Sequence, residues 1–128
     1  EAMLRSRIAA DQLLAFFPEG TSTDGERVLP FKSSLFSVFF LDDHGADLSV
    51  QPVSIRYRPD PASGLPGSFY GWWGTMSFEG HIFDVFARSR RGRVIVTFHE
   101  PVKASAFPHR KALAEHCAAV VRAGHAAS

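Results

Sequence analysis

The residues with the clearest capacity for ligand chemistry lie in one polar segment that follows a short apolar run. Residues 16–34 read FFPEGTSTDGERVLPFKSS. The apolar run Leu13–Phe17 is typical of a strand buried on both faces, and open α/β sheets bind ligands at the carboxyl ends of their strands. Gly20 permits backbone conformations and a close ligand approach that a side chain would prevent. The pattern therefore predicts a ligand-binding loop directly after Phe17.

A helix start behind this loop would add a second feature suited to an anion. Pro30 is typical of the first turn of a helix, which leaves the N–H groups of Phe31 and Lys32 without intrahelical partners. Such N-termini attract anions, and phosphate is the expected ligand. The Lys32 ammonium opposes the helix macrodipole unless an anion is bound beside it. Alternatively, the Lys32 side chain simply extends into water.

Glu19 needs a different role, because two anions repel each other and a carboxylate cannot hold a phosphate. We expect the Glu19 carboxylate to accept a hydrogen bond from a sugar or glycerol hydroxyl of the ligand, or to orient a neighbouring arginine or histidine. Alternatively, Glu19 only caps a turn, since Glu-Gly-Thr is also a common turn sequence.

Composition narrows the classes of protein to be considered. A length of 128 residues suits a single domain, residues 1–128, and a formal net charge of +1 does not indicate a nucleic-acid partner. The single cysteine, Cys117, excludes an internal disulfide and fits a reducing compartment. The histidines lack zinc-ligand spacing, so no metal is expected, and His109, His116 and His125 are expected to be solvated. No apolar run reaches the roughly 18 to 20 residues of a membrane-spanning helix.

The order of the expected elements predicts an α/β fold. Helices are expected at residues 2–12, 30–41, 78–88 and 108–123, and Gly124 is expected to end the last of them. Strands are expected at residues 13–17, 48–58 and 93–102, with Pro52 marking a bulge. This alternation predicts flanking helices and a sheet that is at least partly parallel. Because the sequence opens within a helical pattern, we expect it to be the later part of a longer protein.

Two segments together resemble signature blocks of the glycerolipid acyltransferase family. Residues 16–36, FFPEGTSTDGERVLPFKSSLF, resemble the third block, in which Phe-Pro-Glu-Gly-Thr is followed by a Pro-Phe-Lys helix start. Residues 50–57, VQPVSIRY, resemble the fourth block, a strand with Pro-Val at its centre. The resemblance implies that residues 1–128 are the C-terminal part of an acyltransferase domain. The implied fold is glycerol-3-phosphate acyltransferase-like, a partial three-layer sheet of mixed or parallel strands with flanking helices.

The activity that the resemblance implies is acyl transfer in phospholipid biosynthesis. The donor would be acyl-CoA or acyl-carrier protein, no further cofactor is implied, and the acceptor would be the free hydroxyl of a lysophospholipid, in the manner of a 1-acylglycerol-3-phosphate O-acyltransferase. The implied location is a membrane surface, at the cytoplasmic face of the inner membrane. The residues matched to the family blocks are Glu19, Gly20, Thr21 and Lys32 for acceptor binding, and Pro52 and Val53 for the substrate pocket.

Two departures from the family pattern leave questions open. The family's catalytic block is a histidine and an aspartate separated by four residues; this chain contains no such pair, so we expect it upstream and expect the isolated chain to be inactive. Ser22 stands where the familiar third block has arginine. The acceptor could therefore be lysophosphatidic acid, another lysophospholipid, or a phosphate-free lyso-lipid such as lyso-ornithine lipid. A non-catalytic module that binds lipid or phosphate is the alternative to an enzyme.

One further segment could contact a membrane. The basic cluster RSRRGR, residues 88–93, is either a solvated turn or a contact for anionic lipid head groups. The nearby aromatic residues Phe69, Tyr70, Trp72 and Trp73 are either core residues or an interfacial belt.

Overall fold

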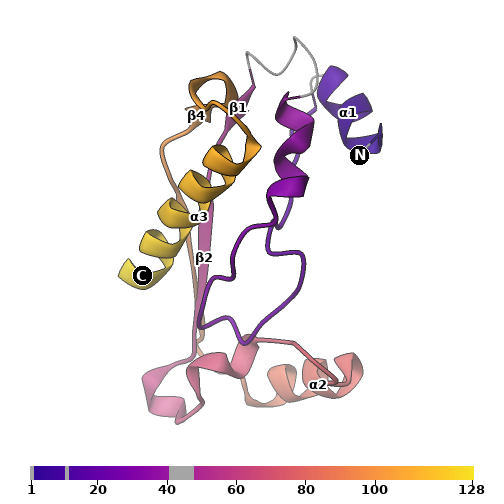
Figure 1. Ribbon diagram of the computed structural model, residues 1–128. Coiled ribbons are helices and arrows are strands. Elements are labelled where there is room, and N and C mark those ends of the chain that lie inside the picture. Colours follow the sequence, from indigo (N-terminus) through magenta and orange to yellow (C-terminus); the bar gives the residue numbers. More distant parts are fainter. Residues whose placement is uncertain (1, 11, 41–47) are drawn as a thin grey trace.

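The computed structural model describes residues 2–10, 12–40 and 48–128. Its α-helices are α1 (Ala2–Ala9), α2 (Phe78–Arg88) and α3 (Arg110–Ala127), and its strands are β1 (Ser49–Val50), β2 (Val53–Arg58), β3 (Arg93–Phe98) and β4 (Val102–Lys103). An eight-residue 3₁₀-helix, η1 (Ser33–Phe40), follows the polar loop, and shorter 3₁₀ turns lie at η3 (Pro61–Ser63), η4 (Gly67–Tyr70) and η5 (Ala104–Ala106). The expected mixture of helices and strands is confirmed (Figure 1).

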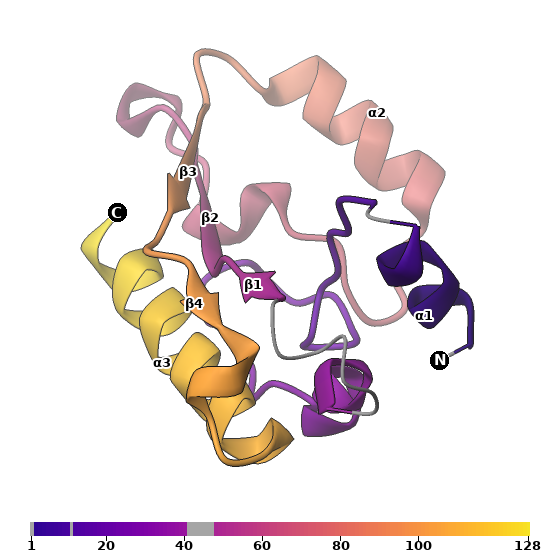
Figure 2. The same ribbon diagram turned by 90° about the horizontal axis from the view of Figure 1, so that it is seen from above.

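The described strands form two antiparallel pairs. Strand β2 pairs with β3, with Val53 opposite Phe98, and β1 pairs with β4. The expected parallel pairing is therefore wrong for these strands. The connection between β2 and β3 takes α2 to one end of the pair and not across its face (Figure 1), so β3 returns along β2 in the opposite direction. Figure 2 shows α2 and α3 on different sides of the strands.

The apolar run Leu13–Phe17 is not a strand, contrary to the prediction. Of the strands that the structure describes, none pairs with it, so it lacks the partner that a buried strand needs for its backbone groups. Only Phe16 contributes its ring to the interior, with its centroid 5.5 Å from that of Phe36. Leu13 and Phe17 are exposed. The hydrophobicity of this run instead serves the core contact of Phe16 and the wall of a cavity.

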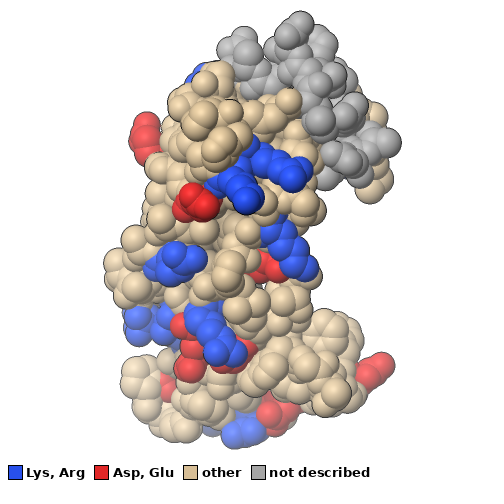
Figure 3. All heavy atoms as spheres, in the orientation of Figure 1, with Lys and Arg blue, Asp and Glu red and all other residues tan. Residues whose placement is uncertain are grey.

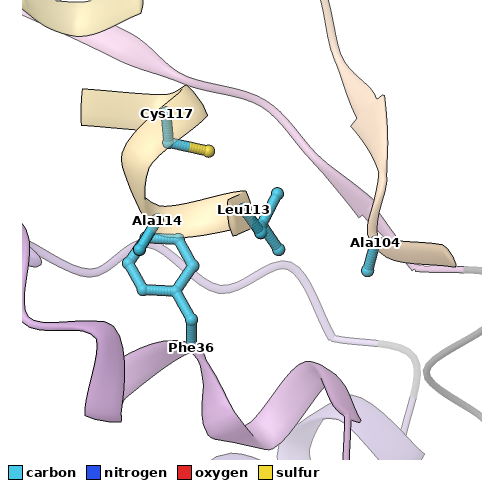
Figure 4. Close-up of a cluster of buried hydrophobic side chains, with 5 residues drawn as sticks. All are labelled: Phe36, Ala104, Leu113, Ala114 and Cys117. Carbon is cyan, nitrogen blue, oxygen red and sulfur yellow. The ribbon is translucent and has the colours of Figure 1, made fainter. Parts of the chain in front are cut away.

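The hydrophobic core lies where α3 meets η1 and the 3₁₀ turn η5. Its fully buried members are Phe36, Ala104, Leu113, Ala114 and Cys117. Figure 4 shows the Phe36 ring extending from η1 to the small side chain of Ala114 on α3. The alanines and cysteine on this face of α3 let the aromatic ring approach the helix closely, which gives the dense packing that stabilises a core.

Helix α3 continues past Gly124 to Ala127, although Gly124 was expected to end it. A Cβ atom on Gly124 would lie 2.7 Å from Oγ of Ser54 and would also collide with the imidazole of His99. Gly124 is therefore needed for the close approach of α3 to β2, and the helix continues because its backbone there is not left-handed. In contrast, the predicted limits of α2 agree with the structure, where Ser77 caps the helix by accepting a hydrogen bond from the Gly80 N–H at 3.3 Å.

Charges of both signs are mixed on one face of the molecule (Figure 3). Lys and Arg side chains are interspersed with Asp and Glu on the face drawn in Figure 3. None of the described helices is both long and apolar enough to cross a bilayer.

Candidate functional site

The polar loop between Phe17 and Lys32 is closed by hydrogen bonds of its own. The Gly20 N–H donates to the Phe17 carbonyl at 3.1 Å, and Gly20 has a φ of +68°, which glycine adopts without strain. The Lys32 N–H donates to the Pro18 carbonyl at 2.8 Å, and the Glu19 Oε2 accepts from the Leu29 N–H at 2.7 Å. These bonds hold the two ends of the loop side by side.

The structure corrects the expected anion site at a helix N-terminus. Helix η1 begins at Ser33 and is a 3₁₀-helix, so Pro30 precedes the helix and is not in its first turn. The Lys32 N–H, which was expected to be free, is satisfied by Pro18. The Lys32 side chain instead lies over Gly20, where a Cβ atom would be 2.6 Å from the lysine Nζ. The Lys32 ammonium thus lies beside the loop, whereas the backbone N–H of Lys32 closes the loop.

Glu19 makes a structural contact with a residue ten positions further along the chain, which differs from the expected alternative of a local turn cap. Its half-buried carboxylate bonds to the backbone of Leu29 across the loop. Such a bond between a carboxylate and a buried N–H fixes the loop's conformation. A bond from Glu19 to a ligand hydroxyl stays a prediction.

A cavity of about 470 Å³ lies between this loop and a second loop. Phe17 and residues 19–25 form one wall, and the other wall is formed by Tyr57, Gly67, Tyr70, Gly71 and Trp72. The two loops touch directly, because a Cβ atom on Gly71 would lie 2.7 Å from the carbonyl carbon and oxygen of Asp24. We call this space the head-group cavity.

The side chains around the head-group cavity are acidic and aromatic. Glu19 and Asp24 are the charged residues among those described in its lining, which contains no lysine or arginine. The Asp24 Oδ1 accepts a hydrogen bond from the Glu26 N–H at 3.1 Å, and its Oδ2 lies 3.9 Å from the mostly exposed guanidinium of Arg27. Two carboxylates thus lie in the lining of the cavity, and the Lys32 ammonium lies beside Gly20 of the same wall.

A larger cavity of about 690 Å³ adjoins the first. Its walls come from the run before the loop, from η1, from β2 and from α3, and they are mainly aliphatic and aromatic, including Leu14, Phe16, Phe31, Phe39, Val53 and Ile55. The two cavities share the lining residues Phe17, Glu19, Thr23, Gly25 and Tyr57. We call the larger space the chain cavity. Its volume is in the range of cavities that enclose small apolar molecules.

The residues selected from the sequence are only partly brought together. Glu19, Gly20 and Thr21 line the head-group cavity, and Val53 lines the chain cavity. Lys32 adjoins Gly20 but lines neither cavity. Pro52 is buried and lines neither; its carbonyl accepts a hydrogen bond from the His99 N–H at 3.0 Å.

His125 is the main residue that sequence reasoning missed. It was expected to be solvated, but it is buried at 7% exposure and lines the chain cavity. Nη1 of Arg56 lies 3.0 Å from His125 Nδ1, and His125 Nε2 lies 3.0 Å from the Gly25 carbonyl oxygen. Because an arginine only donates and a carbonyl only accepts, the tautomer with its proton on Nε2 satisfies both contacts. His125 could have been found from its spacing, because it lies four residues after Val121 and eight after Cys117, on the buried face of α3.

Two further groups could suggest nucleophilic chemistry, and their surroundings argue against it. Burial raises the pKa of the Cys117 thiol to about 11, so it is not a thiolate at neutral pH. Ser54 Oγ lies 3.0 Å from His99 Nε2, but Ser54 is buried at 2% exposure between β2 and α3 and lines neither cavity. Among the described residues, no group of three His, Cys, Asp or Glu side chains is placed to hold a metal.

Comparison with known proteins relates the chain to a family of lipid-modifying enzymes. A family model described as Acyltransferase matches residues 1–56. The lyso-ornithine lipid O-acyltransferase of Rhodobacter capsulatus is 46% identical over 126 residues, which cover 97% of this chain and 44% of the relative. The protein of the same name from Brucella abortus is 35% identical, covering 94% of this chain and 47% of the relative.

A third protein of that name, from Pseudomonas aeruginosa, is 34% identical over 70% of this chain and 31% of its own length. The chain thus spans less than half the length of each of these relatives. No solved structure matches the chain.

Proposed function

We propose that the chain belongs to the glycerolipid acyltransferase family and that the protein carrying it acylates the free hydroxyl of lyso-ornithine lipid. The donor is a thioester, either acyl-CoA or acyl-carrier protein. The acceptor oxygen forms a new bond to the acyl carbon, the carbon–sulfur bond breaks, and the hydroxyl proton passes to a general base. The chain contributes to a three-layer, glycerol-3-phosphate acyltransferase-like domain.

One observation carries the choice of acceptor. The relative of 46% identity, which matches 97% of this chain, is named for lyso-ornithine lipid. The head-group cavity supports the same choice, because its charged lining is acidic and a phosphate would be repelled by Glu19 and Asp24. Ser22, in the position where the family's familiar block has arginine, removes a bidentate phosphate partner. A phosphate-free head group fits these residues better.

Within this function the chain binds and orients substrates. Residues 19–25 bind the head group, and Gly20 and Thr21 offer backbone and hydroxyl groups on the wall of the head-group cavity. Lys32, beside Gly20, is available for an anionic part of the acceptor. The chain cavity, with Val53 on its wall, holds the hydrocarbon chain and keeps water from the thioester. Pro52 supports this wall from behind.

The general base lies outside residues 1–128. The family's pair, a histidine and an aspartate separated by four residues, is absent from the sequence, and the buried His125 is held by Arg56 and Gly25. The described residues therefore orient the hydroxyl but do not deprotonate it. We expect residues 1–128 alone to transfer no acyl group.

The protein acts at a membrane surface, on the cytoplasmic side. Phe83 and Phe86 on α2 are 73% and 81% exposed, and Trp72 and Trp73 in the loop before it are also exposed. Arg90 and Arg91 follow directly and are exposed. Aromatic and basic side chains together favour the interface of an anionic bilayer.

A second candidate acceptor is lysophosphatidic acid, which corresponds to the 1-acylglycerol-3-phosphate type of activity. The observation in its favour is the Lys32 ammonium beside Gly20, because lysine is a common phosphate ligand. This cation lies outside the lining of the head-group cavity, so lyso-ornithine lipid remains our first choice.

An acyl-transfer assay with the full-length protein tests the proposal. Labelled acyl-CoA and labelled acyl-carrier protein are each offered with lyso-ornithine lipid and, separately, with lysophosphatidic acid. We expect labelled ornithine lipid from at least one donor and a lower kcat/KM for lysophosphatidic acid. Transfer to lysophosphatidic acid alone would overturn the choice of acceptor, and transfer to neither would overturn acyl transfer to a lyso-lipid. Residues 1–128, assayed in parallel, should give no product.

A further inference from the structure

We infer that the head-group cavity is a binding site for a primary ammonium, in which Asp24 supplies the negative charge and Tyr57, Tyr70 and Trp72 supply aromatic faces and edges. The ligand group is the side-chain ammonium of the ornithine head group. The inference rests on the proposed function and assigns to these residues a part of the acceptor that the family resemblance does not address.

Two carboxylates line the cavity, and they differ in how many of their oxygens remain able to accept a bond from a ligand. Oε2 of Glu19 is engaged by the Leu29 N–H, so much of its bonding capacity holds the loop. Asp24 accepts one backbone bond through Oδ1, whereas its Oδ2 is only 3.9 Å from Arg27, whose side chain is 72% exposed. A contact this long to an exposed guanidinium is weak. A ligand ammonium in the cavity can therefore bond to Oδ2 of Asp24 more closely than Arg27 does.

The aromatic side chains face the same space and are held in place. Tyr57 and Tyr70 have their ring centroids 6.0 Å apart. The Tyr70 hydroxyl is hydrogen-bonded to Ser89 Oγ at 2.6 Å, and the Trp72 Nε1–H donates to the Met76 carbonyl at 3.0 Å. Because these partners occupy the polar atoms of Tyr70 and Trp72, the parts left for a ligand are the π systems. Aromatic faces attract ammonium groups.

Contacts between the two loops set the distance from the carboxylate to the rings. Gly71, between Tyr70 and Trp72, lies directly on the backbone of Asp24. The ring of Trp72 is also packed edge-to-face on Phe78, with the centroids 5.5 Å apart. The aspartate and the rings are thus fixed relative to each other without a ligand. Binding therefore costs little side-chain conformational entropy. Lys32, beside Gly20, remains for the head group's own carboxylate.

Equilibrium binding to the full-length protein tests the inference. The probes are a short-chain lyso-ornithine lipid and the same lipid with its side-chain amine acetylated, which removes the charge and keeps the chain. We expect the wild type to bind the charged probe about tenfold more tightly, a ratio typical of one charge-assisted contact with a cation–π contribution. Asp24→Asn should bind both probes about equally. Trp72→Leu, which keeps Asp24, should reduce the ratio of the two affinities because it removes one aromatic face.

The control is Glu115→Gln, which removes one negative charge from an exposed position of α3 at a residue that lines neither cavity. This variant should keep the wild-type ratio. Equal binding of both probes by the wild type, or an unchanged ratio in Asp24→Asn, would overturn the inference. Acylation of lyso-ornithine lipid by the wild type is measured in parallel. Absence of acylation contradicts the proposed function, whereas acylation without any preference for the charged probe contradicts only the ammonium site.

Discussion

The two adjoining cavities differ in what builds their walls. The chain cavity is bounded largely by regular elements, η1, β2 and α3, and by the apolar run before the loop. The head-group cavity is bounded mainly by the polar loop and by the segment of η4 and the residues after it, which meet where Gly71 lies on Asp24, together with Tyr57 of β2. A lipid has the same division, with an apolar chain and a polar head group. We therefore expect separate parts of the protein to select the length of the lipid's hydrocarbon chain and the identity of its head group. Each preference should then respond to its own substitutions.

The strongest test of this separation is Gly71→Ala. The added Cβ would lie 2.7 Å from the Asp24 carbonyl, so the two loops must move apart. Overpacking of this kind costs about 1–3 kcal/mol, and we expect the acceptor KM of the full-length enzyme to rise about tenfold or more, with the donor KM unchanged. Steady-state kinetics with each substrate varied in turn measures this. Gly80→Ala in α2, where a Cβ meets Ser77 at an ordinary 3.6 Å, is the control. Equal changes in both KM values would argue against separate sites.

Val53→Phe tests the chain cavity. The larger side chain would occupy space on the wall formed by β2, so lipids with long chains should lose kcat/KM relative to short ones. We expect the ratio of kcat/KM for long-chain to short-chain lipids to fall roughly tenfold, which corresponds to about 1.4 kcal/mol. A series of acyl lengths, compared with wild type, measures the shift. Val94→Phe on β3, a half-exposed position outside both cavities, should leave the preference unchanged. A shift in head-group preference instead would break the proposed division.

His125 joins the two regions, because it lines the chain cavity and bonds to Gly25, which lines both. His125→Ala leaves the Gly25 carbonyl without this donor, a loss of about 0.5–1.5 kcal/mol. We expect the acceptor KM to rise about three- to tenfold, with a smaller change in kcat. His125→Gln can restore a donor to Gly25 and should recover part of the loss. If both variants change only the melting temperature and not the acceptor KM, His125 supports the fold without positioning the loop.

The smallest expected effect concerns Cys117 on the wall of the chain cavity. Burial raises the pKa of its thiol to about 11, so the reactive thiolate is scarce at pH 7 and becomes abundant only as the pH approaches that value. Iodoacetamide should therefore modify the native protein slowly at pH 7.5 and faster with rising pH. Mass spectrometry measures the rate. Fast modification at pH 7.5, matching that of a denatured sample, would show that this wall is open to solvent.

Elements with a strong local signal were predictable from the sequence. The sequence predicts α2 with the limits that the structure has, and it predicts a strand after Gly92, although β3 ends at Phe98 and not at the expected residue 102. Local patterns do not tell how elements meet. Leu13–Phe17 has the composition of a strand but lacks a strand partner in the described part of the chain, and Gly124 looks like a helix stop although it serves a close contact with β2.

The candidate site was predictable as a loop but not as a charge distribution. The motif Phe-Pro-Glu-Gly-Thr identified residues 19–21, which do line a cavity. The expected anion site failed at the Lys32 amide, because its partner, the Pro18 carbonyl, lies on the other side of the loop. Tyr57, Tyr70 and Trp72 join the same cavity from distant positions, and His125 reaches Gly25 from the end of α3. The spacing along α3 indicates that His125 is buried, but the partners of His125 and of the three aromatic residues depend on tertiary packing.

The most direct measurement of the central claim is an experimental structure of the full-length protein with lyso-ornithine lipid bound. The account predicts that the ornithine ammonium lies between the Asp24 carboxylate and the rings of Tyr70 and Trp72, and that the hydrocarbon chain passes Glu19 into the cavity beside Val53. A head group bound away from residues 19–25, or a hydrocarbon chain lying against Asp24, would contradict it.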